Sequence, residues 1–492
     1  MKKLVALMLA MALCLSMVVI SASAEETFKI TIFVDGTIPD QNNGRDQFEA
    51  RWEELHPGFD LEIIQPDHSA YYDVMQQRMS NPQDWPDVLI LSSTYYVDYA
   101  SAGALWDMTE AWENSKTKNS GRFTGDNVFE GLKVDGKLYG FAPTRGNGCI
   151  TYVKKAWMDE CGITEEPTTY DAYIAMLKAF TEKYGTYAVA AAGFVGGEAP
   201  FINYLPEFYQ DAYPYFVQQE DGTWVDGFTQ DSMKAALQRI QDAVKDGLID
   251  KETLTNTTAD ARNKFYDDKF GVFTYWAGTW ATNLKTNLEA NGKSGELVAL
   301  KPLEGLPLYF DRVPPVWCIT TACKDPQKVF DAFIDTMLDG GDTQMLFTYG
   351  PEEVYWSTKA GTVLDKEYAD GQFHMLENLE KPGALYTKYH IDPMLALASF
   401  ADGYYDPKEE SVQPEAKAAS ELFNANSRLA SLVPGTPELT ELNGDLTQLK
   451  SEIIADIALG NITVEEGYAR FESDGGLENS NAIVESLNNL GK

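Results

Sequence analysis

Apolar and polar residues alternate along the first part of the chain in short runs of strand and helix character. Phe28 to Val34 alternates apolar with polar residues, which predicts a half-buried strand. Phe48, Trp52 and Leu55 recur at helical spacing and share one face. The same patterns predict strands at 59–64 and 87–91 and helices at 71–79 and 92–103. This order of strands and helices indicates a mainly parallel sheet covered on both faces.

The second half of the chain continues this alternation. Strands are expected at 271–276 and 316–320, and a helix is expected at 232–247. An apolar stripe at helical spacing, from Val329 to Met337, predicts a further helix, and from about Leu439 the pattern is helical. The sequence contains no internal repeat and no low-complexity linker. We therefore expect two lobes that exchange strands, rather than two domains joined by one tether.

The first 24 residues differ in composition from the rest of the chain. Lys2 and Lys3 precede an apolar run from Leu4 to Ile20, and Ala22-Ser23-Ala24 supplies the small residues of a cleavage site. The apolar run is near the lower limit for spanning a membrane, and the chain turns acidic at Glu25. We interpret residues 1–24 as a cleavable secretory signal, which predicts an exported protein, periplasmic or extracellular at the cell surface.

The cysteines do not indicate a disulfide framework or a metal site. Cys14 lies in the signal segment, and Leu13 before it is not the small residue that lipid attachment requires. The other cysteines are too few for a disulfide scaffold and lack the C-x-x-C spacing of a metal site: Cys149, Cys161, Cys318 and Cys323.

Charge and missing motifs exclude several classes of function. The formal net charge of −36 repels phosphate backbones, so a nucleic acid partner is not expected. The 4 histidines show no metal-binding spacing, and the sequence contains no G-x-S-x-G, no G-x-G-x-x-G and no complete P-loop. We therefore predict no catalytic residue, no metal and no cofactor.

Several short segments occur in one order along the chain. They read W-P-D-V-L at 85–89, G-A-L-W-D-M-T at 103–109, V-D-G-K-L-Y-G-F-A-P at 134–143, E-P-T-T-Y at 166–170, K-F-G-V-F at 269–273 and Y-G-P-E-E-V-Y at 349–355. Together they resemble the extracellular solute-binding proteins of ABC import systems, in the branch that serves mostly oligosaccharides, and the last segment resembles a lipoprotein-like subgroup. Two features depart from that pattern. A lipid-attachment motif is missing, and Val153 follows Tyr152 where the family usually has Asn.

This resemblance implies a two-lobed α/β fold of the periplasmic-binding-protein type II, each lobe a mainly parallel sheet flanked by helices. Lobe 1 would comprise 25–143 plus 308–345, and lobe 2 would comprise 144–307 plus 346–492 with the C-terminal helices. The hinge would be crossed more than once, at 143–145, at 303–307 and between Gly340 and Tyr349. The resemblance also implies a monomer that captures a carbohydrate, most simply an oligosaccharide, and delivers it to ABC permease subunits.

A sugar presents C–H faces that lie against aromatic rings and hydroxyls that need planar donors and acceptors. Polar candidates follow the first strand and the strand at 87–91, where open α/β sheets bind ligands: Asp35, Thr37, Asn43, Ser93 and Tyr95. Each polar residue among them can instead serve a turn or a helix cap. Near the expected crossing, Arg145 can bind a ligand or form a salt bridge that fixes the hinge, and Asn147 lies beside it.

The remaining candidates are mainly aromatic. Trp276 and Trp280 flank small residues that could expose a ring face, and we favour Trp276 as the plate and Trp280 as core. The other candidates can bind sugar or simply pack: Tyr204, Trp317, Glu352, Tyr355 and Trp356.

Three alternatives remain open from the sequence. The ligand could be a peptide, polyamine or vitamin. A thiamine-degrading transferase of the same fold would use a cleft cysteine, for which Cys149 is the candidate, but its spacing to Tyr152 and the missing acid do not match. An adhesion or scaffolding role is disfavoured because the sequence shows no repeat and no anchor.

Overall fold

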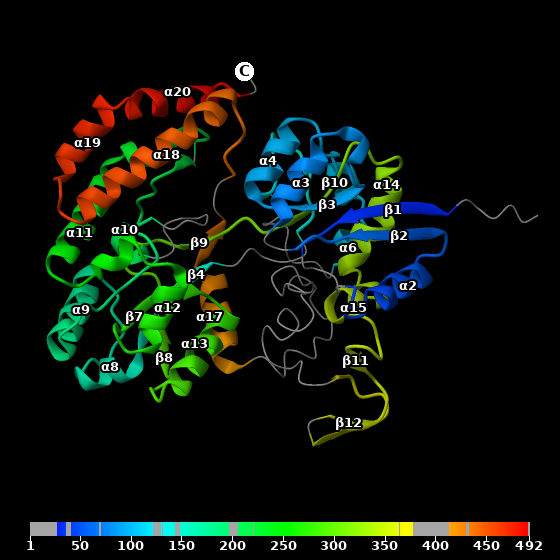
Figure 1. Cartoon of the computed structure of the whole chain (residues 1–492), viewed down its shortest axis with the longest axis horizontal. Coiled ribbons are helices and arrows are strands. Elements are labelled where there is room, and N and C mark those ends of the chain that lie inside the picture. The colour runs from blue at the N-terminus through cyan, green and yellow to red at the C-terminus, as the bar shows by residue number, and fades with distance from the viewer. Residues whose placement is uncertain are drawn as a thin grey trace, which may run out of the picture.

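The structure is a computed structural model. It describes residues 27–35, 41–67, 70–121, 129, 131–142, 148–195, 205–219, 221–363, 365–376, 413–429 and 432–490. Two groups of elements lie side by side along the long axis, one around β1–β3 and one around β4 and β7 (Figure 1). Two separate hydrophobic cores underlie these groups. We call them the first lobe (27–142 and 313–376) and the second lobe (148–310 and 413–490).

The first lobe is built on a four-stranded sheet in the order β10-β3-β1-β2. Strands β1 (Phe28–Phe33), β2 (Phe59–Ile64) and β3 (Val88–Leu91) are parallel, and β10 (Val316–Ile319) is antiparallel to β3. The predicted strands and the mainly parallel arrangement are therefore confirmed in this lobe. β10 comes from the chain after the second lobe, as expected for lobes that exchange strands.

Helices surround this sheet, and those predicted at 71–79 and 92–103 begin and end close to where the periodicity places them. They are α2 (Arg45–Leu55), α3 (Tyr71–Met79), α4 (Ser93–Ser101), α5 (Thr109–Glu113), α6 (Lys116–Asn119), α14 (Pro326–Val329) and α15 (Asp342–Tyr349), with a 3-10 turn at Pro82–Asp84. The stripe after β10 is not one regular α-helix. It continues from α14 as a π-helical turn (Phe330–Ile334) and a 3-10 turn (Asp335–Leu338), which bury Phe330, Phe333 and Met337 completely.

The second lobe is built on a three-stranded sheet in the order β7-β4-β8. β4 (Cys149–Lys154) is antiparallel to both β7 (Val272–Trp276) and β8 (Leu297–Ala299). The prediction of a mainly parallel sheet is therefore wrong for these strands. β4 starts where the chain enters the lobe and β7 ends there, so Cys149 faces Trp276 and the two strands run in opposite directions. The parallel component is limited to isolated bridges from Val189.

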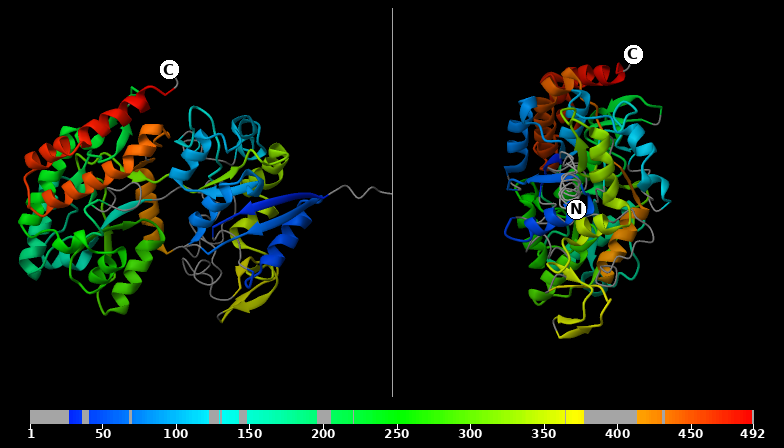
Figure 2. Two further views of the ribbon diagram at one scale, coloured as in Figure 1. Left: turned by 45° about the horizontal axis from the view of Figure 1, so that its top comes forward. Right: turned by 90° about the vertical axis from the view of Figure 1, so that its right-hand side faces the viewer.

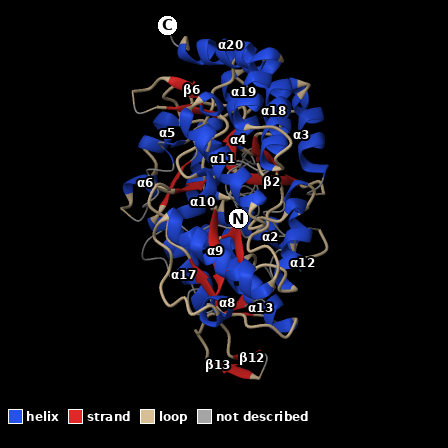
Figure 3. Cartoon of the chain, turned by 90° about the vertical axis from the view of Figure 1, so that its left-hand side faces the viewer, coloured by secondary structure: helices blue, strands red, loops and turns tan. Residues whose placement is uncertain are grey.

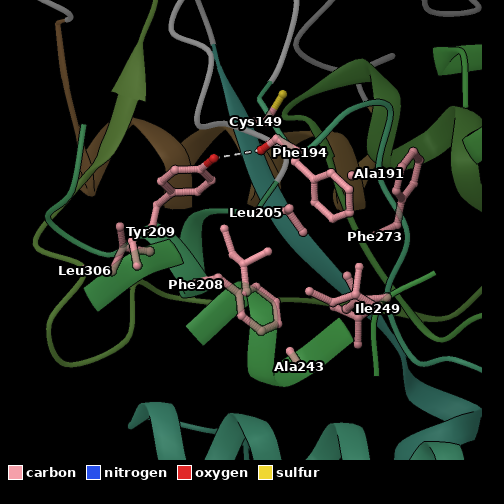
Figure 4. Packing of buried hydrophobic residues seen from close by; sticks show 14 of the residues in the cluster. Cys149, Ala191, Phe194, Leu205, Phe208, Tyr209, Ala243, Ile249, Phe273 and Leu306 are labelled. Atoms are coloured by element: carbon pink, nitrogen blue, oxygen red, sulfur yellow. Dashed lines mark hydrogen bonds between the residues drawn. The ribbon is translucent and has the colours of Figure 1, made fainter. Parts of the chain in front are cut away.

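The other elements of the second lobe pack around this sheet. They are α8 (Lys155–Glu160), α9 (Tyr170–Tyr184), α10 (Pro206–Tyr209), β5 (Phe216–Gln218), β6 (Trp224–Asp226), α11 (Asp231–Lys245), α12 (Thr258–Tyr266) and α13 (Thr279–Ala290), with 3-10 turns at Gly227–Thr229 and Lys251–Leu254. Figure 4 shows a part of this core, where the Tyr209 hydroxyl donates to the Phe194 carbonyl at 2.9 Å.

The C-terminal helices belong to the second lobe. They are α17 (Pro414–Ala425), α18 (Pro437–Ala458), α19 (Val464–Ser473) and α20 (Gly476–Asn488). In Figure 2 they cover the lobe that is otherwise green. A buried ion pair between Lys450 Nζ and Asp226 Oδ1, 2.7 Å long, fastens α18 to β6. None of the helices in the described residues is long and apolar enough to cross a membrane.

The chain passes between the two cores three times. The first passage falls between Ala142 and Cys149, and its predicted residues, 143–145, lie outside the described residues. The second lies at 311–313, not at 303–307, because Leu303, Leu306 and Phe310 still pack in the second core.

The third passage follows 376 and precedes α17, outside the described residues, not between Gly340 and Tyr349. Phe347 packs in the first core, and Tyr355 donates a hydrogen bond to the Asn43 carbonyl. The packing therefore differs from the predicted division in two places: residues 308–310 lie with the second lobe, and residues 346–376 lie with the first.

The end of that first-lobe segment projects from the body. It contains the strands β11 (Trp356–Ser357), β12 (Gly361–Val363), β13 (Lys366–Tyr368) and β14 (His374–Met375). The β12–β13 hairpin lies at the opposite end of the view from α20 (Figure 3).

Candidate functional site

The carboxyl ends of β1 and β3 form one edge of the first-lobe sheet. These strands are parallel neighbours, so the residues that follow them come together. Asp35 follows β1 and is 7% exposed, and Ser92 follows β3 and precedes α4. Burial raises the pKa of the Tyr72 phenol on α3, opposed by a hydrogen bond with Ser92, and the Asp35 carboxylate raises it further. Asp35 therefore lies at this edge, and its role in ligand binding stays a prediction.

A ladder of three tyrosine rings lies beside the edge. Tyr72 and Tyr95 are stacked with ring centres 4.8 Å apart, and Tyr99 follows Tyr95 at 6.5 Å. The Tyr95 hydroxyl also accepts a hydrogen bond from Gln76 Nε2. Because the Tyr72 ring stacks on Tyr95, the covered face of Tyr95 is not free to stack on a sugar. Tyr95 lies at the predicted place but packs in the ladder.

Trp276 ends β7 at the matching edge of the second lobe. Its backbone carbonyl accepts a hydrogen bond from the Tyr152 hydroxyl at 3.0 Å, and its partly buried ring packs against the second core. The guanidinium carbon of Arg312 lies 5.0 Å from the centre of that ring. Arg312 stands in the passage between the lobes, immediately after β9 (Tyr309–Asp311). The arrangement places a ring and a cation at the edge next to the hinge.

The backbone at this hinge is tightly packed, which explains its glycines. A Cβ on Gly148 would lie 2.2 Å from the Phe310 carbonyl oxygen. A Cβ on Gly278, whose φ is +71°, would lie 2.9 Å from Ser420 Oγ on α17. β9 also pairs in parallel with β15 (Ser427–Leu429). The absence of a side chain at Gly278 therefore makes room for α17. The sequence interpretation was instead that the small residues between Trp276 and Trp280 expose a ring face.

Several predicted site residues are engaged elsewhere. Trp317 is completely buried in the first core between Phe333 and Phe347, so its ring is not accessible to a solute. Trp280 packs within the second lobe, edge-on to Tyr275 and under the Arg262 guanidinium, as expected for the core member of the tryptophan pair.

The predicted cluster around residue 355 forms a turn that packs against the first lobe. Tyr355 is completely buried and its hydroxyl holds the Asn43 carbonyl. Trp356 donates through Nε1 to the Gly350 carbonyl at 2.8 Å and stacks on Phe373. Glu352, which is exposed, and Trp356, which is partly buried, line a small pocket of about 70 Å³ with Arg51 and Asp342. These contacts bring Asn43 and Tyr355 together, but they leave Trp356 without a contact to Trp276 among the described residues.

Some predicted residues fall where the structure gives no description. Thr37, Arg145, Asn147 and Tyr204 lie outside the described residues. Ser93 begins α4, but its side chain is not described.

Sequence reasoning missed Arg312 and Tyr72. Arg312 could have been found from its place in Asp311-Arg312-Val313-Pro314-Pro315. Two consecutive prolines argue against a central strand, so they mark a connecting segment in which a charged side chain can reach a site. Tyr72 carried no such signal, since its spacing fits the helix 71–79 equally well.

A separate groove of about 360 Å³ also lies between the lobes. Val97 and the turn at 133–136 line it from the first lobe, and Gln218, Trp224 and Asn488 line it from the second. It shares no lining residue with the strand-end edge. Within the described part of the chain, no group of three His, Cys, Asp or Glu side chains is placed to hold a metal ion.

Comparison with known proteins agrees with this architecture. Residues 40–307 match the family model of the bacterial extracellular solute-binding proteins. This chain belongs to that family. The match covers more than half of the sequence, and the members of this family are exported binding proteins. A search of curated protein sequences finds no match.

Solved structures of several binding proteins share the fold at low sequence identity. The N-glycan transport solute binding protein from Streptococcus pneumoniae is 16% identical with a TM-score of 0.61, covering 94% of this chain and 98% of its own. An alginate-binding protein solved without calcium is 15% identical with a TM-score of 0.59, covering 94% and 97%. A maltose-bound protein from T. maritima is 15% identical with a TM-score of 0.54, covering 94% and 99%. The predicted two-lobed α/β fold is confirmed.

Proposed function

We propose that this protein is the solute-binding component of an ABC importer and that it binds an oligosaccharide between its lobes. One observation carries the proposal: Trp276, which ends β7 in the second lobe, lies 5.0 Å from the guanidinium of Arg312 in the passage between the lobes. The family and the sugar-binding relatives of the same fold support it.

The site would use the two kinds of surface that a sugar offers. The Trp276 ring would supply an apolar plate once the Arg312 guanidinium turns from the ring toward the sugar, and Asp35 and Arg312 would supply an acceptor and a fork of donors. Closure of the lobes around the hinge would exclude water from these contacts. The lobes would divide at 142–149, at 311–313 and after 376. The protein would act as a monomer in the periplasm or at the cell surface, delivering its solute to permease subunits.

We propose binding without turnover. A transferase would require Cys149 as an accessible thiolate, but Cys149 is 1% exposed at the start of β4. Loss of thiamine during overnight incubation with the wild type, abolished in Cys149→Ala, would contradict this part of the proposal.

Thermal shift with a solute panel tests the proposal. The panel contains maltotriose, cellotriose, xylotriose and triacetylchitotriose, with a tripeptide, spermidine and thiamine as non-sugar arms. A solute that binds only the folded protein stabilises it by about 2.7 kcal/mol at a hundred times its Kd, so a sugar should raise Tm measurably. A Tm shift with the tripeptide, spermidine or thiamine, and with none of the sugars, would contradict the proposed carbohydrate ligand but not the proposed role as a solute-binding protein.

Trp276→Ala serves as the matched site variant. It should abolish the shift given by the sugar, whereas Trp280→Phe, which keeps an aromatic ring against Tyr275, should preserve it. Equal shifts in wild type and Trp276→Ala would place the solute elsewhere.

A further inference from the structure

Lys264 on α12 donates hydrogen bonds to three side chains of one loop, which we call the 250–256 loop. Its Nζ lies 2.8 Å from Asp250 Oδ2, 2.5 Å from Glu252 Oε2 and 2.7 Å from Asn256 Oδ1. The side chains of Lys264 and Asp250 are 21% and 7% exposed, whereas that of Glu252 is 70% exposed. An ammonium group has three N–H donors, so these acceptors use all of them. The loop is therefore folded around one positive charge that the chain itself supplies.

The 250–256 loop in turn holds a neighbouring stretch of backbone. Thr253 accepts a hydrogen bond from the Ala191 amide through Oγ1, at 3.2 Å, and one from the Gly193 amide through its carbonyl, at 2.7 Å. Asn256, whose Oδ1 faces the ammonium, donates through Nδ2 to the Ala191 carbonyl at 3.1 Å. One amide side chain therefore connects the ammonium to this backbone.

The backbone held in this way lies at the edge of the second lobe where Trp276 ends β7. Val189 forms parallel bridges both with Ile249 and with Val272 of β7. The three stretches therefore run in one direction, and the residues that follow Val189 and Ile249 extend toward the end of β7. Ligands of open α/β sheets bind outside the carboxyl ends of the strands. The contacts of Lys264 thus lead to the same edge as the proposed solute site.

We propose that Lys264 is a positioning residue of the solute site: its ammonium is the fixed cation of the 250–256 loop and, through Asn256, holds residues 191–193 in place at the edge of the second lobe. The inference rests on the proposed function. Ordering a flexible loop when a solute binds costs free energy. An edge that is already held in the solute-free protein avoids this cost, so Lys264 contributes to affinity without contacting the solute.

Lys154 provides a matched control, because it is a buried ammonium at the opposite end of the same sheet. Its Nζ donates to the Phe265 carbonyl at 2.7 Å and to Asp268 Oδ1 at 2.5 Å. Lys154 ends β4, which is antiparallel to β7, so it lies away from the edge that carries Trp276. Loss of either ammonium leaves acceptors unpaired and should lower stability. Only the loss of Lys264 should also disturb the solute site.

The first experiment measures amide hydrogen exchange in the solute-free protein by mass spectrometry. In Lys264→Met, the Ala191 and Gly193 amides should exchange about tenfold faster than in the wild type, because their acceptor Thr253 belongs to a loop that is no longer closed. In Lys154→Met, exchange of the same amides should stay within about twofold of the wild type. An unchanged rate in Lys264→Met, or an equal acceleration in both variants, would overturn the inference.

The second experiment measures affinity by calorimetry, using the panel trisaccharide that gives the largest thermal shift. Lys264→Met should weaken binding about tenfold, whereas Lys154→Met should stay within about twofold of the wild type. Far-UV circular dichroism establishes that each variant is folded at the temperature of the titration. Wild-type affinity in a folded Lys264→Met, or an equal loss in Lys154→Met, would reject the positioning role while the proposed function stands.

Asn256→Leu tests the connection itself and replaces Lys264→Met should that variant fail to fold. It breaks the contacts of Asn256 with the ammonium and with Ala191, but it leaves the pair between Lys264 and Asp250 in place. It should weaken trisaccharide binding as much as Lys264→Met does. The double variant should lose little more than either single one, because both changes break the same path. Full additivity of the two losses, or wild-type affinity in Asn256→Leu, would reject the connection.

The two kinds of measurement separate this inference from the proposed function. Failure of the wild type to bind any solute of the panel would overturn the proposed function. The exchange experiment needs no solute, so it would still decide whether the Lys264 ammonium holds residues 191–193.

Discussion

The two lobes bury charge in different ways. In the first lobe, buried Asp335 accepts hydrogen bonds from the backbone amides of Lys116 and Thr117. In the second lobe, Lys450 and Asp226 form an ion pair with side chains 5% and 1% exposed. Both contacts join residues more than two hundred positions apart, but Asp335 is held by backbone amides, whereas Asp226 and Lys450 are opposite charges that depend on each other. Single charge removals should therefore affect the second lobe most.

The largest expected effect is the loss of that ion pair. Lys450→Met leaves Asp226 buried with only its remaining partners, Ser480 Oγ and the Phe228 amide. Removing one partner of a buried pair costs about 3–5 kcal/mol. Urea denaturation should report this loss in the free energy of unfolding.

Arg470→Ala serves as the exposed counterpart in the same helices. Its bridges to Glu452 and Asp456 are solvent-exposed, so the cost should stay below about 1 kcal/mol. An equal loss of unfolding free energy in Lys450→Met and Arg470→Ala would mean that burial does not make the Lys450 ion pair more important for stability than the Arg470 bridges.

The second prediction concerns Glu207, a buried carboxyl of the second lobe. Burial raises its pKa to about 7, with Thr151 and Tyr173 opposing that shift through hydrogen bonds. Tyr173 and Tyr309 are the titratable groups that face it, from α9 and β9. The pKa is raised above the unfolded value of 4.5, so the stabilisation is complete below 4.5 and is lost as the pH rises through 7.

Glu207→Gln should remove this pH dependence. The wild type should lose about 3 kcal/mol of unfolding free energy between pH 4.5 and pH 7 relative to the variant. Chemical denaturation at several pH values measures the difference. Parallel pH profiles for both proteins would refute the assignment.

The third prediction concerns His56 of the first lobe, which should make stability depend on pH in the direction opposite to Glu207. Burial lowers the pKa of His56 to about 4 from 6.5, and its ring stacks on Trp52 while Nε2 lies 3.0 Å from Thr343 Oγ1. The stabilisation is complete above pH 6.5 and is lost as the pH falls through 4. The expected loss is about 1 kcal/mol, allowing for solvent screening of a half-buried ring.

His56→Gln should flatten the acid side of the stability profile. Combined with Glu207→Gln, it sharpens the comparison, because the two variants should remove slopes of opposite sign over overlapping pH windows, from about 4 to 6.5 for His56 and from 4.5 to about 7 for Glu207. A single slope removed by both would show that the two lobes do not titrate separately.

The smallest expected effect concerns Tyr355→Phe. The variant loses one hydrogen bond to the Asn43 carbonyl, which costs about 1 kcal/mol. Thermal unfolding should register that loss, while the affinity for the panel trisaccharide should stay unchanged. A tenfold loss of affinity would instead place Tyr355 in the binding site, as the sequence interpretation had it.

Sequence patterns that depend on residues within one helix or strand predicted the structure correctly, whereas predictions that depend on contacts between distant residues did not. The strand at 59–64 and the helix at 71–79 follow from side-chain periodicity within one element, and the structure reproduces both ranges. Trp317 and Tyr355 were predicted for the site because tryptophan and tyrosine suit sugars, yet both are completely buried. An aromatic residue in a strand or turn looks the same whether it faces a core or a ligand.

The sequence by itself determined the class of fold, the separation into two lobes and the family, because periodicity and ordered motifs are properties of neighbouring residues. Only the tertiary structure decided the antiparallel second sheet, the passage at 311–313 and the meeting of Arg312 with Trp276. Strand direction and hinge position depend on where distant segments enter each core. A ring and a guanidinium 36 positions apart come into contact only because β7 and β9 end at the same hinge.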